Sequence, residues 1–231
     1  MPFELRGHGI LAVVLDIEGT TTPIQFVYDV LFPYARRHAA KYLPQTDLTD
    51  LKLEHDEDVR RGNQPPAWTD GAEDYVCWLM DQDRKSTALK RIQGEIWLEG
   101  YKNRELHGEV FPDVTPALKR WRESGIDVRI FSSGSVLAQC LLFSSTRDGD
   151  LTRYLFGYFD TTTGPKNEPS SYEAIARAFK LFPQDILFVS DVTRELDAAQ
   201  QAGMQTRLCV RPGNHPQPPH EHKTITTFLD I

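Results

Sequence analysis

The sequence is poor in the residues that build disulfide frameworks and zinc sites. Only three cysteines occur in 231 residues, Cys77, Cys140 and Cys209, and no two of them form a Cys-x-x-Cys pair. An odd number at wide, irregular spacing favours neither a disulfide framework nor a structural zinc site. Each has apolar neighbours, as in Val76-Cys77-Trp78, so we expect three small buried thiols.

Long hydrophobic runs and an excess of positive charge are also absent. No apolar run approaches the ~20 residues that cross a membrane, and the first residues lack the basic start and apolar stretch of a signal peptide. The formal net charge is -7 with no run of Lys and Arg, which argues against nonspecific binding to nucleic acid. We therefore expect a cytoplasmic protein that binds neither membranes nor nucleic acid.

Histidines do not add a metal site to this pattern. His215, His220 and His222 lie in a proline-rich segment near the end of the sequence. Two histidines two residues apart suggest a metal only when a third ligand accompanies them at suitable spacing, and none does. We expect these side chains to be solvated loop residues.

The sequence does contain short apolar runs of the kind found in parallel sheets. The run Ile10–Leu15 is rich in branched residues and is followed by turn formers, which is typical of a strand buried on both faces. We expect further strands at 128–131, 186–189 and 206–210, and a less marked one at 158–160.

Helical patterns alternate with these strands from about residue 110 onward. We expect helices at 115–124, 170–181 and 195–202, and the first and last of these are closed by Gly125 and Gly203. Strands that alternate with helices imply βαβ units. The sequence therefore predicts an α/β fold with a doubly wound, Rossmann-like parallel sheet.

The segment 24–107 has a different pattern. It contains helix-like stretches separated by polar ones, and the acidic run 54–58 is expected to be a solvated face or loop. We predict that 24–107 forms a small helical domain inserted into a core domain made of 1–23 and 108–231.

Polar side chains follow the predicted strands at the edge where a doubly wound sheet binds its ligands. Asp16 and Glu18 follow the expected strand at 10–15. Ser132 and Ser133 follow the strand at 128–131, and Asp191 follows the strand at 186–189. Lys166 precedes the expected helix at 170–181. A strand-end acid alone is commonly a solvated turn residue, and Asp191 alone could cap the next helix. Their common position favours one active site.

This set of residues suits phosphoryl transfer. A carboxylate such as Asp16 attacks phosphorus once the negative charge of the phosphate is neutralised. Asp16 and Asp191 supply hard oxygen ligands for Mg²⁺, which prefers one or two carboxylates plus water and substrate phosphate. Ser132 with the following backbone N–H groups suits phosphoryl oxygens, and Lys166 offsets the remaining negative charge.

The motifs resemble those of the haloacid-dehalogenase (HAD) superfamily. Its phosphatases carry Asp-x-Asp-x-Thr, and the chain has Asp16-Ile17-Glu18-Gly19-Thr20, with Glu in place of the second Asp. Longer blocks resemble the enolase-phosphatases of methionine salvage over nearly the whole chain: 15–24, 131–139, 159–161, 164–166, 189–195 and 210–214.

The resemblance implies an enzyme that enolises 2,3-diketo-5-methylthiopentyl 1-phosphate and then removes its phosphate to give the acireductone 1,2-dihydroxy-3-keto-5-methylthiopentene. It implies an HAD-type core with an inserted helical cap. It also implies a monomer that uses one Mg²⁺ ion per chain and no partner beyond the small phosphate ester.

The resemblance assigns a role to each candidate residue. Asp16 is the nucleophile, which forms an aspartyl-phosphate intermediate, and Glu18 is the general acid and base. The resemblance assigns the magnesium ligands to Asp16, Asp191 and the main-chain carbonyl of Glu18. The substrate phosphate is bound by Ser132, Ser133 and Lys166, and Lys166 also stabilises the catalytic site. Glu195 supports the metal ligands without binding the metal itself.

Three other interpretations of the residues stay open. The first is a plain phosphatase that acts on a sugar phosphate or nucleotide without enolising it. The second is a catalytically silent relative that only binds a phospholigand, although such proteins typically lack the equivalents of Asp16, Lys166 or Asp191. The third is a carbon–halogen hydrolase, which would not need magnesium; Glu18 and Asp191 argue against it.

Overall fold

The computed structural model describes residues 5–68, 72–82, 84 and 86–231. The chain divides into two compact units, one made of Met1–Phe26 with His107–Ile231 and the other of Val27–Leu106. These bounds lie within three residues of the division expected from the sequence. That the smaller unit serves as a cap stays a prediction.

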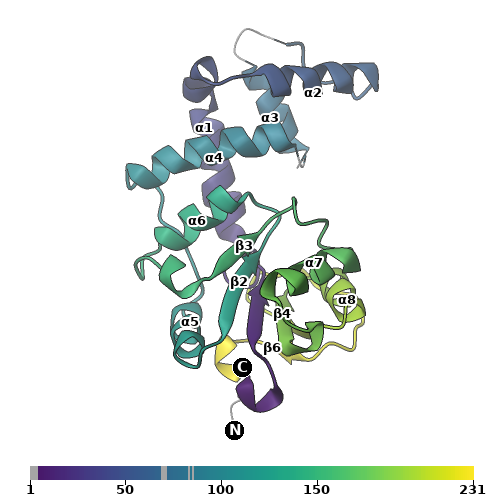
Figure 1. Cartoon of the computed structure of the whole chain (residues 1–231). Coiled ribbons are helices and arrows are strands. Elements are labelled where there is room, and N and C mark those ends of the chain that lie inside the picture. Colours follow the sequence, from purple (N-terminus) through teal and green to yellow (C-terminus); the bar gives the residue numbers. More distant parts are fainter. Residues whose placement is uncertain (1–4, 69–71, 83, 85) are drawn as a thin grey trace. The chain divides into compact units, whose positions relative to one another are not determined.

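The larger unit is built on a six-stranded parallel sheet with the order β3-β2-β1-β4-β5-β6 (Figure 1). All five expected strands are present, and the doubly wound sheet is confirmed. A short sixth strand was not expected. The strands are β1 Ala12–Leu15, β2 Asp127–Phe131, β3 Gly157–Phe159, β4 Ile186–Ser190, β5 Gln205–Cys209 and β6 Thr224–Ile225.

Four α-helices connect these strands: α5 Val114–Glu123, α6 Val136–Ser144, α7 Pro169–Phe179 and α8 Thr193–Gln201. Three of them were expected, and α6 was not. The described residues of this unit also contain four 3₁₀ turns: Arg6–His8, Thr152–Tyr154, Pro183–Asp185 and Phe228–Asp230.

Helices α7 and α8 cover one face of the sheet through an apolar core. Tyr172 and Ile175 of α7 and Leu196 of α8 pack with Val14 and Phe188 of the central strands. Since side chains alternate along a strand, the neighbours of Val14 point to the opposite face, where α5 packs on β2 (Figure 1). The central strands are therefore buried on both faces, as their unbroken apolar runs predict.

The register of the sheet brings three strand ends level with one another. Leu15 of β1 is opposite Ile130 of β2 on one side and Val189 of β4 on the other. The chain moves from β1 to β2 and β3 in one direction and then returns to β4 on the other side of β1. The strand order thus reverses at β1 and β4, the kind of position where open α/β sheets bind ligands.

The smaller unit is helical, as expected. After a π-helical segment, Phe26–Leu31, it contains α1 Phe32–Tyr42, a 3₁₀ turn Leu43–Gln45, α2 Thr49–Arg60, α3 Glu73–Asp81 and α4 Thr87–Lys102. Helix α4 begins after Ser86, whose side chain accepts a hydrogen bond from the Leu89 N–H at 3.0 Å. This serine cap satisfies one of the N–H groups left over at the start of a helix.

The acidic run 54–58 is not simply a solvated face, and this expectation was wrong for two of its residues. The run lies within α2, and Asp58 (1% exposed) and His55 (5% exposed) face inward. Asp58 accepts hydrogen bonds from Tyr75 Oη and Asn63 Nδ2, both at 2.7 Å, and from Arg84 at 3.0 Å. A carboxylate can be buried here because these donors replace the water it loses.

The cysteines and histidines also differ in part from expectation. All three cysteines are free, but only Cys209 is buried, while Cys77 and Cys140 are partly exposed. The side chain of His222 is only 4% exposed, because it lies between Asp197 (2.9 Å) and Thr206 (3.0 Å). It belongs to the packed surface of α8 and β5 and not to a solvated loop.

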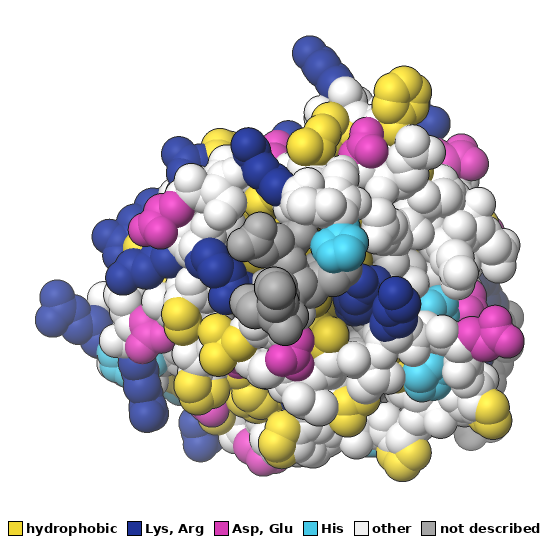
Figure 2. Space-filling model, turned by 90° about the horizontal axis from the view of Figure 1, so that it is seen from below, with side chains coloured by type: hydrophobic (Ala, Val, Ile, Leu, Met, Phe, Trp, Pro, Cys, Tyr) yellow, Lys and Arg dark blue, Asp and Glu magenta, His cyan; other side chains and the backbone are white. Residues whose placement is uncertain are grey.

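The surface carries side chains of both charge signs. On the face seen in Figure 2, Lys and Arg side chains are interspersed with acidic and apolar ones. Among the described residues, no helix is both long enough and apolar enough to cross a membrane.

The buried carboxylate of α2 gives a test of the smaller unit. We expect Asp58→Asn to lower the free energy of unfolding by about 2 kcal/mol, because an amide cannot accept from three donors as a carboxylate does. This corresponds to roughly 4–8 °C in thermal unfolding followed by circular dichroism. Asp56→Asn is the matched control, since Asp56 is exposed and its contacts with Lys52 and with the adjacent His55 lie within its own helix. Equal losses in the two variants would contradict the role of Asp58.

Candidate active site

The centre of the site is Lys166, held between two carboxylates. Its Nζ lies 2.5 Å from Asp16 Oδ1 and 2.6 Å from Glu195 Oε2, and the Lys166 and Asp16 side chains are less than one tenth exposed. Burial alone would lower the pKa of Lys166, but the charges of the two carboxylates outweigh it and raise the pKa above its ordinary value. Lys166 is therefore a fixed positive charge beside the predicted nucleophile.

The loop before α7 presents this lysine. Tyr172 Oη donates to the main-chain carbonyl of Lys166, and Ser171 Oγ donates to that of Pro165, both at 2.7 Å. Gly164 adopts φ 139°, and a Cβ there would lie 2.3 Å from Ser171 Oγ. The loop is thus bound to the helix that follows it, which fixes the start of the lysine side chain.

Asp191 and Glu195 enter the site from the end of β4. Glu195 lies in the first turn of α8 and accepts a hydrogen bond from Ser190 Oγ at 2.9 Å. Burial, followed by the negative charges of Asp16 and Glu195, raises the pKa of Asp191. Burial also raises the pKa of Glu195, although Lys166 partly opposes the shift. The carboxylates are close enough to repel one another, and one lysine does not balance them.

The loop that follows Asp16 is tightly folded. The Asp16 N–H continues the sheet by donating to Val189 O at 3.0 Å, while Thr21 Oγ1 donates to the carbonyls of Asp16 and Ile17 at 3.1 and 3.2 Å. Gly19 has φ 71°, and a Cβ there would lie 2.3 Å from Asp191 Oδ2. Only glycine lets this backbone approach the carboxylate so closely.

Ser132 and Ser133 follow β2 beside this loop. Ser132 is buried, its N–H donates to Phe159 O at 3.2 Å, and its Oγ accepts from the Gly134 N–H at 3.1 Å. Ser133 is exposed. Gln139 of α6 donates to the carbonyls of Gly134 and Phe159, both at 2.9 Å, and so fixes the turn that carries the two serines.

The structure joins some of the predicted residues directly and places the others at the same edge. Asp16 and Lys166 are in contact, and Asp191 is near enough to Asp16 for their charges to interact. Glu18 is exposed and pairs in a short bridge with Thr22 of the same loop. Glu195 touches Lys166 and so has a larger part in the site than the sequence suggested.

The site suits a hard cation whose coordination is completed by water and substrate and not by protein side chains alone. The described residues contain no cluster of three or more His, Cys, Asp or Glu side chains arranged to hold a metal. Mg²⁺ does not need one, because it binds one or two carboxylates and keeps positions for water and phosphate. Asp16 and Asp191 are buried acids with unbalanced negative charge, which a cation would offset.

Sequence reasoning assigned no role to several residues that shape this site. Ser190, Tyr172 and Gln139 each hold a loop that carries a candidate residue. Arg211 and Asn214 bind the loop after Asp16 from a distant part of the chain. In the sequence, the block 210–214 that contains both residues indicates the family resemblance but no particular role for either of them.

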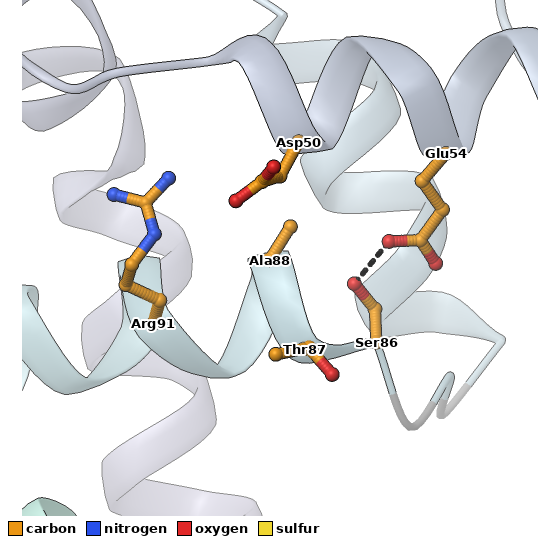
Figure 3. Close-up of a pocket in the computed structure, with 6 residues that line it drawn as sticks. All are labelled: Asp50, Glu54, Ser86, Thr87, Ala88 and Arg91. Atoms are coloured by element: carbon orange, nitrogen blue, oxygen red, sulfur yellow. Dashed lines mark hydrogen bonds between the residues drawn. The ribbon is translucent and has the colours of Figure 1, made fainter.

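A hollow of about 430 Å³ lies in the smaller unit between α2 and the start of α4 (Figure 3). Glu54 there accepts a hydrogen bond from Ser86 Oγ at 2.5 Å, and Arg91 donates to the carbonyl of Asp47 at 2.6 Å. None of the predicted catalytic residues lines it.

The close approach at Gly19 gives a direct test. We expect Gly19→Ala to lower kcat for phosphate-ester hydrolysis by about 100-fold or more, because the methyl group would displace Asp191 and misplace the site by about 1 Å. Gly9→Ala is the matched control: Gly9 has a similar φ of 77° but no atom within 4 Å of its Cβ position. Its change should cost stability alone, so equal losses of kcat would contradict the role given to Gly19.

The raised pKa of Asp191 predicts how pH affects stability when a chelator removes divalent cations. The folded pKa is above the unfolded one, so the folded state binds more protons between them and its stability falls as pH rises through that window. Asp191→Asn removes this loss. We expect its melting temperature to exceed that of the wild type by about 3 °C or more at pH 7 and by less near pH 4. A difference that does not grow with pH would contradict this account.

Comparison with known proteins agrees with this geometry. The profile of the haloacid dehalogenase-like hydrolases matches residues 10–203. The enolase-phosphatase E1 of Synechococcus elongatus is 48% identical over 96% of this chain and 98% of its own length. That of Pseudomonas fluorescens is 43% identical over 96% and 97%.

A solved structure supports the same relationship. The UTR4 protein of Saccharomyces cerevisiae superposes with a TM-score of 0.77 at 33% identity, covering 94% of this chain and 98% of that protein. The profile match, the identities over nearly full length and the shared fold together show that the chain belongs to the enolase-phosphatase E1 family of haloacid dehalogenase-like hydrolases.

Proposed function

We propose that the chain is the enolase-phosphatase of methionine salvage, which enolises 2,3-diketo-5-methylthiopentyl 1-phosphate and then releases phosphate and the acireductone. The observation that carries this proposal is the buried contact of Asp16 with Lys166, at the sheet edge where Ser132 and Asp191 also lie. The high identity to enolase-phosphatases supports the choice of substrate.

Asp16 acts as the nucleophile. Lys166 binds Oδ1 of its carboxylate, and the second oxygen attacks phosphorus to form an aspartyl-phosphate. Because Lys166 remains protonated, it orients Asp16 without taking part in proton transfer and reduces the repulsion between carboxylate and phosphate. Ser132 and Ser133 with the N–H groups of their turn hold the transferring phosphoryl oxygens.

One Mg²⁺ ion per chain completes this site, and Asp16, Asp191 and the main-chain carbonyl of Glu18 would hold it. When bound, it supplies positive charge to the phosphate oxygens as negative charge shifts toward the leaving group.

Glu18 acts as the general acid and base. It lies two residues after the nucleophile. Glu18 is exposed, whereas Asp16 is buried, so Glu18 can exchange protons with substrate and water. It protonates the leaving oxygen during attack by Asp16 and then takes a proton from the water that hydrolyses the aspartyl-phosphate.

The remaining expectations belong to the same proposal. The protein acts as a monomer in the cytoplasm on a small soluble phosphate ester. Residues 27–106 form the cap, which keeps water from the reactive enediol. Their separation into a helical unit supports this role.

The proposed function is tested by supplying the diketo phosphate with Mg²⁺ and following the acireductone by ultraviolet absorbance and phosphate by a colorimetric assay. We expect both products from the wild type. Asp16→Asn should slow phosphate release by about 1,000-fold or more, because an amide is a far poorer nucleophile with the same shape. Asp148→Asn is the control, since that exposed acid binds Thr115 on α5.

Two outcomes would contradict the proposal. Phosphate release without the absorbance of an acireductone would identify a plain phosphatase. Unchanged phosphate release by Asp16→Asn would exclude the covalent mechanism.

A further inference from the structure

The loop that carries the nucleophile is held from outside at three consecutive carbonyl groups. The carbonyl of Gly19 accepts from Asn214 Nδ2 at 3.0 Å, that of Thr20 from Arg211 Nε at 3.2 Å, and that of Thr21 from the Phe111 N–H at 2.9 Å. Asn214 and Arg211 belong to the turn that follows β5. This turn therefore fixes the backbone between the predicted nucleophile and the rest of the core.

The two hydrogen bonds of the Asn214 amide determine which way its oxygen points. Nδ2 donates to the carbonyls of both Gly19 and Cys209, at 3.0 and 3.2 Å. An amide oxygen in that position would face two acceptors, so the assignment of nitrogen and oxygen is unambiguous. Oδ1 is thereby directed away from both carbonyls.

Oδ1 of Asn214 is buried and unpaired. Within the described part of the chain no donor reaches it. It lies against Gly19, where a Cβ would be 2.9 Å from this oxygen and 2.3 Å from Asp191 Oδ2. Two acceptors, one of them a carboxylate, therefore face the same side of Gly19, and a buried acceptor without a partner is unfavourable.

This arrangement calls for a positive or hydrogen-donating group beside both oxygens. Arg211 does not supply it, because its Nε and Nη1 donate to Asp113 at 3.0 Å and to the carbonyls of Thr20 and Thr226. Its Nη2 makes no hydrogen bond with the described residues but lies 2.9 Å from Asp113 Oδ2, with which it forms an ion pair. Lys166 is bound to Asp16 and Glu195. The magnesium ion of the proposed function, or a water that it carries, would supply it.

We propose that Asn214 is a positioning residue of the magnesium site, with Oδ1 facing the ion or its bound water next to Asp191 and Nδ2 holding the loop that presents Asp16. The proposal rests on the magnesium dependence in the proposed function. A neutral amide suits this place, because a further carboxylate would add to the repulsion among Asp16, Asp191 and Glu195.

The test measures Mg²⁺ binding through thermal stability, without substrate. The melting temperatures of wild type, Asn214→Asp and Asn214→Leu are followed from excess chelator to saturating MgCl₂, and Kd is taken from the increase. We expect Asn214→Asp to be less stable in chelator but to bind Mg²⁺ about 10-fold more tightly than wild type. Asn214→Leu should bind it about 10-fold more weakly.

The two variants separate the proposed role from a purely structural one. Both lose the donor to Gly19 and Cys209, so a structural role alone would change their Mg²⁺ affinity in the same direction. Arg120→Gln is the matched control, because Arg120 donates to the carbonyl of Phe228, near residues that Arg211 binds, but not to the nucleophile loop. It should lower stability and leave the Mg²⁺ affinity as in wild type.

The outcomes distinguish this assignment from the magnesium proposal itself. If MgCl₂ does not stabilise the wild type, the magnesium dependence fails. If the wild type is stabilised but both Asn214 variants bind Mg²⁺ as it does, or both deviate in the same direction, the role of Asn214 is overturned. Opposite shifts for Asp and Leu support it.

Discussion

The site depends on one buried interaction, the contact of Lys166 with Asp16 and Glu195. A single ammonium group cannot balance these two acids and Asp191. Burial, together with the neighbouring negative charges, raises the pKa values of Asp191 and Glu195. Burying such an excess is unfavourable unless a cation joins it. The same imbalance therefore destabilises the free protein at this edge, and it is the reason why the proposed function places a metal ion beside the substrate phosphate here.

Holding these charges close requires a backbone that tolerates close approach. The sheet sets the first constraint, because its register places the ends of β1 and β4 side by side. Gly19 then turns with positive φ directly against Asp191, where a side chain would collide with the carboxylate. Since Asn214 and Arg211 hold the carbonyls of this turn, its geometry exists before any ligand binds. Preorganised groups of this kind lower the cost of reaching the transition state.

The sequence predicted the parts of the molecule that follow from local patterns. A strand buried on both faces reads as an unbroken apolar run, so β1 and β4 and the residues after them could be located, and with them Asp16 and Asp191. Helix α6 was missed because its residues are apolar nearly throughout and show no stripe, and β6 because two residues carry no periodicity. Asp58 was misread because its burial depends on donors from three other segments.

The role of Asn214 lay beyond sequence patterns for a more general reason. Its acceptor Gly19 is 195 positions away, and nothing in a proline-rich turn indicates that one amide will bind so distant a carbonyl as well as the nearby carbonyl of Cys209. A nucleophile must stand on a rigid strand end and so has a local signature, whereas a residue that steadies it can come from any segment that the fold brings near. Such a residue acts by positioning other groups, so its role can be inferred only from what surrounds both the donor and the acceptor atom of its side chain. In Asn214, the donor Nδ2 binds the Gly19 carbonyl, and the acceptor Oδ1 lies on the same side of Gly19 as the carboxylate of Asp191.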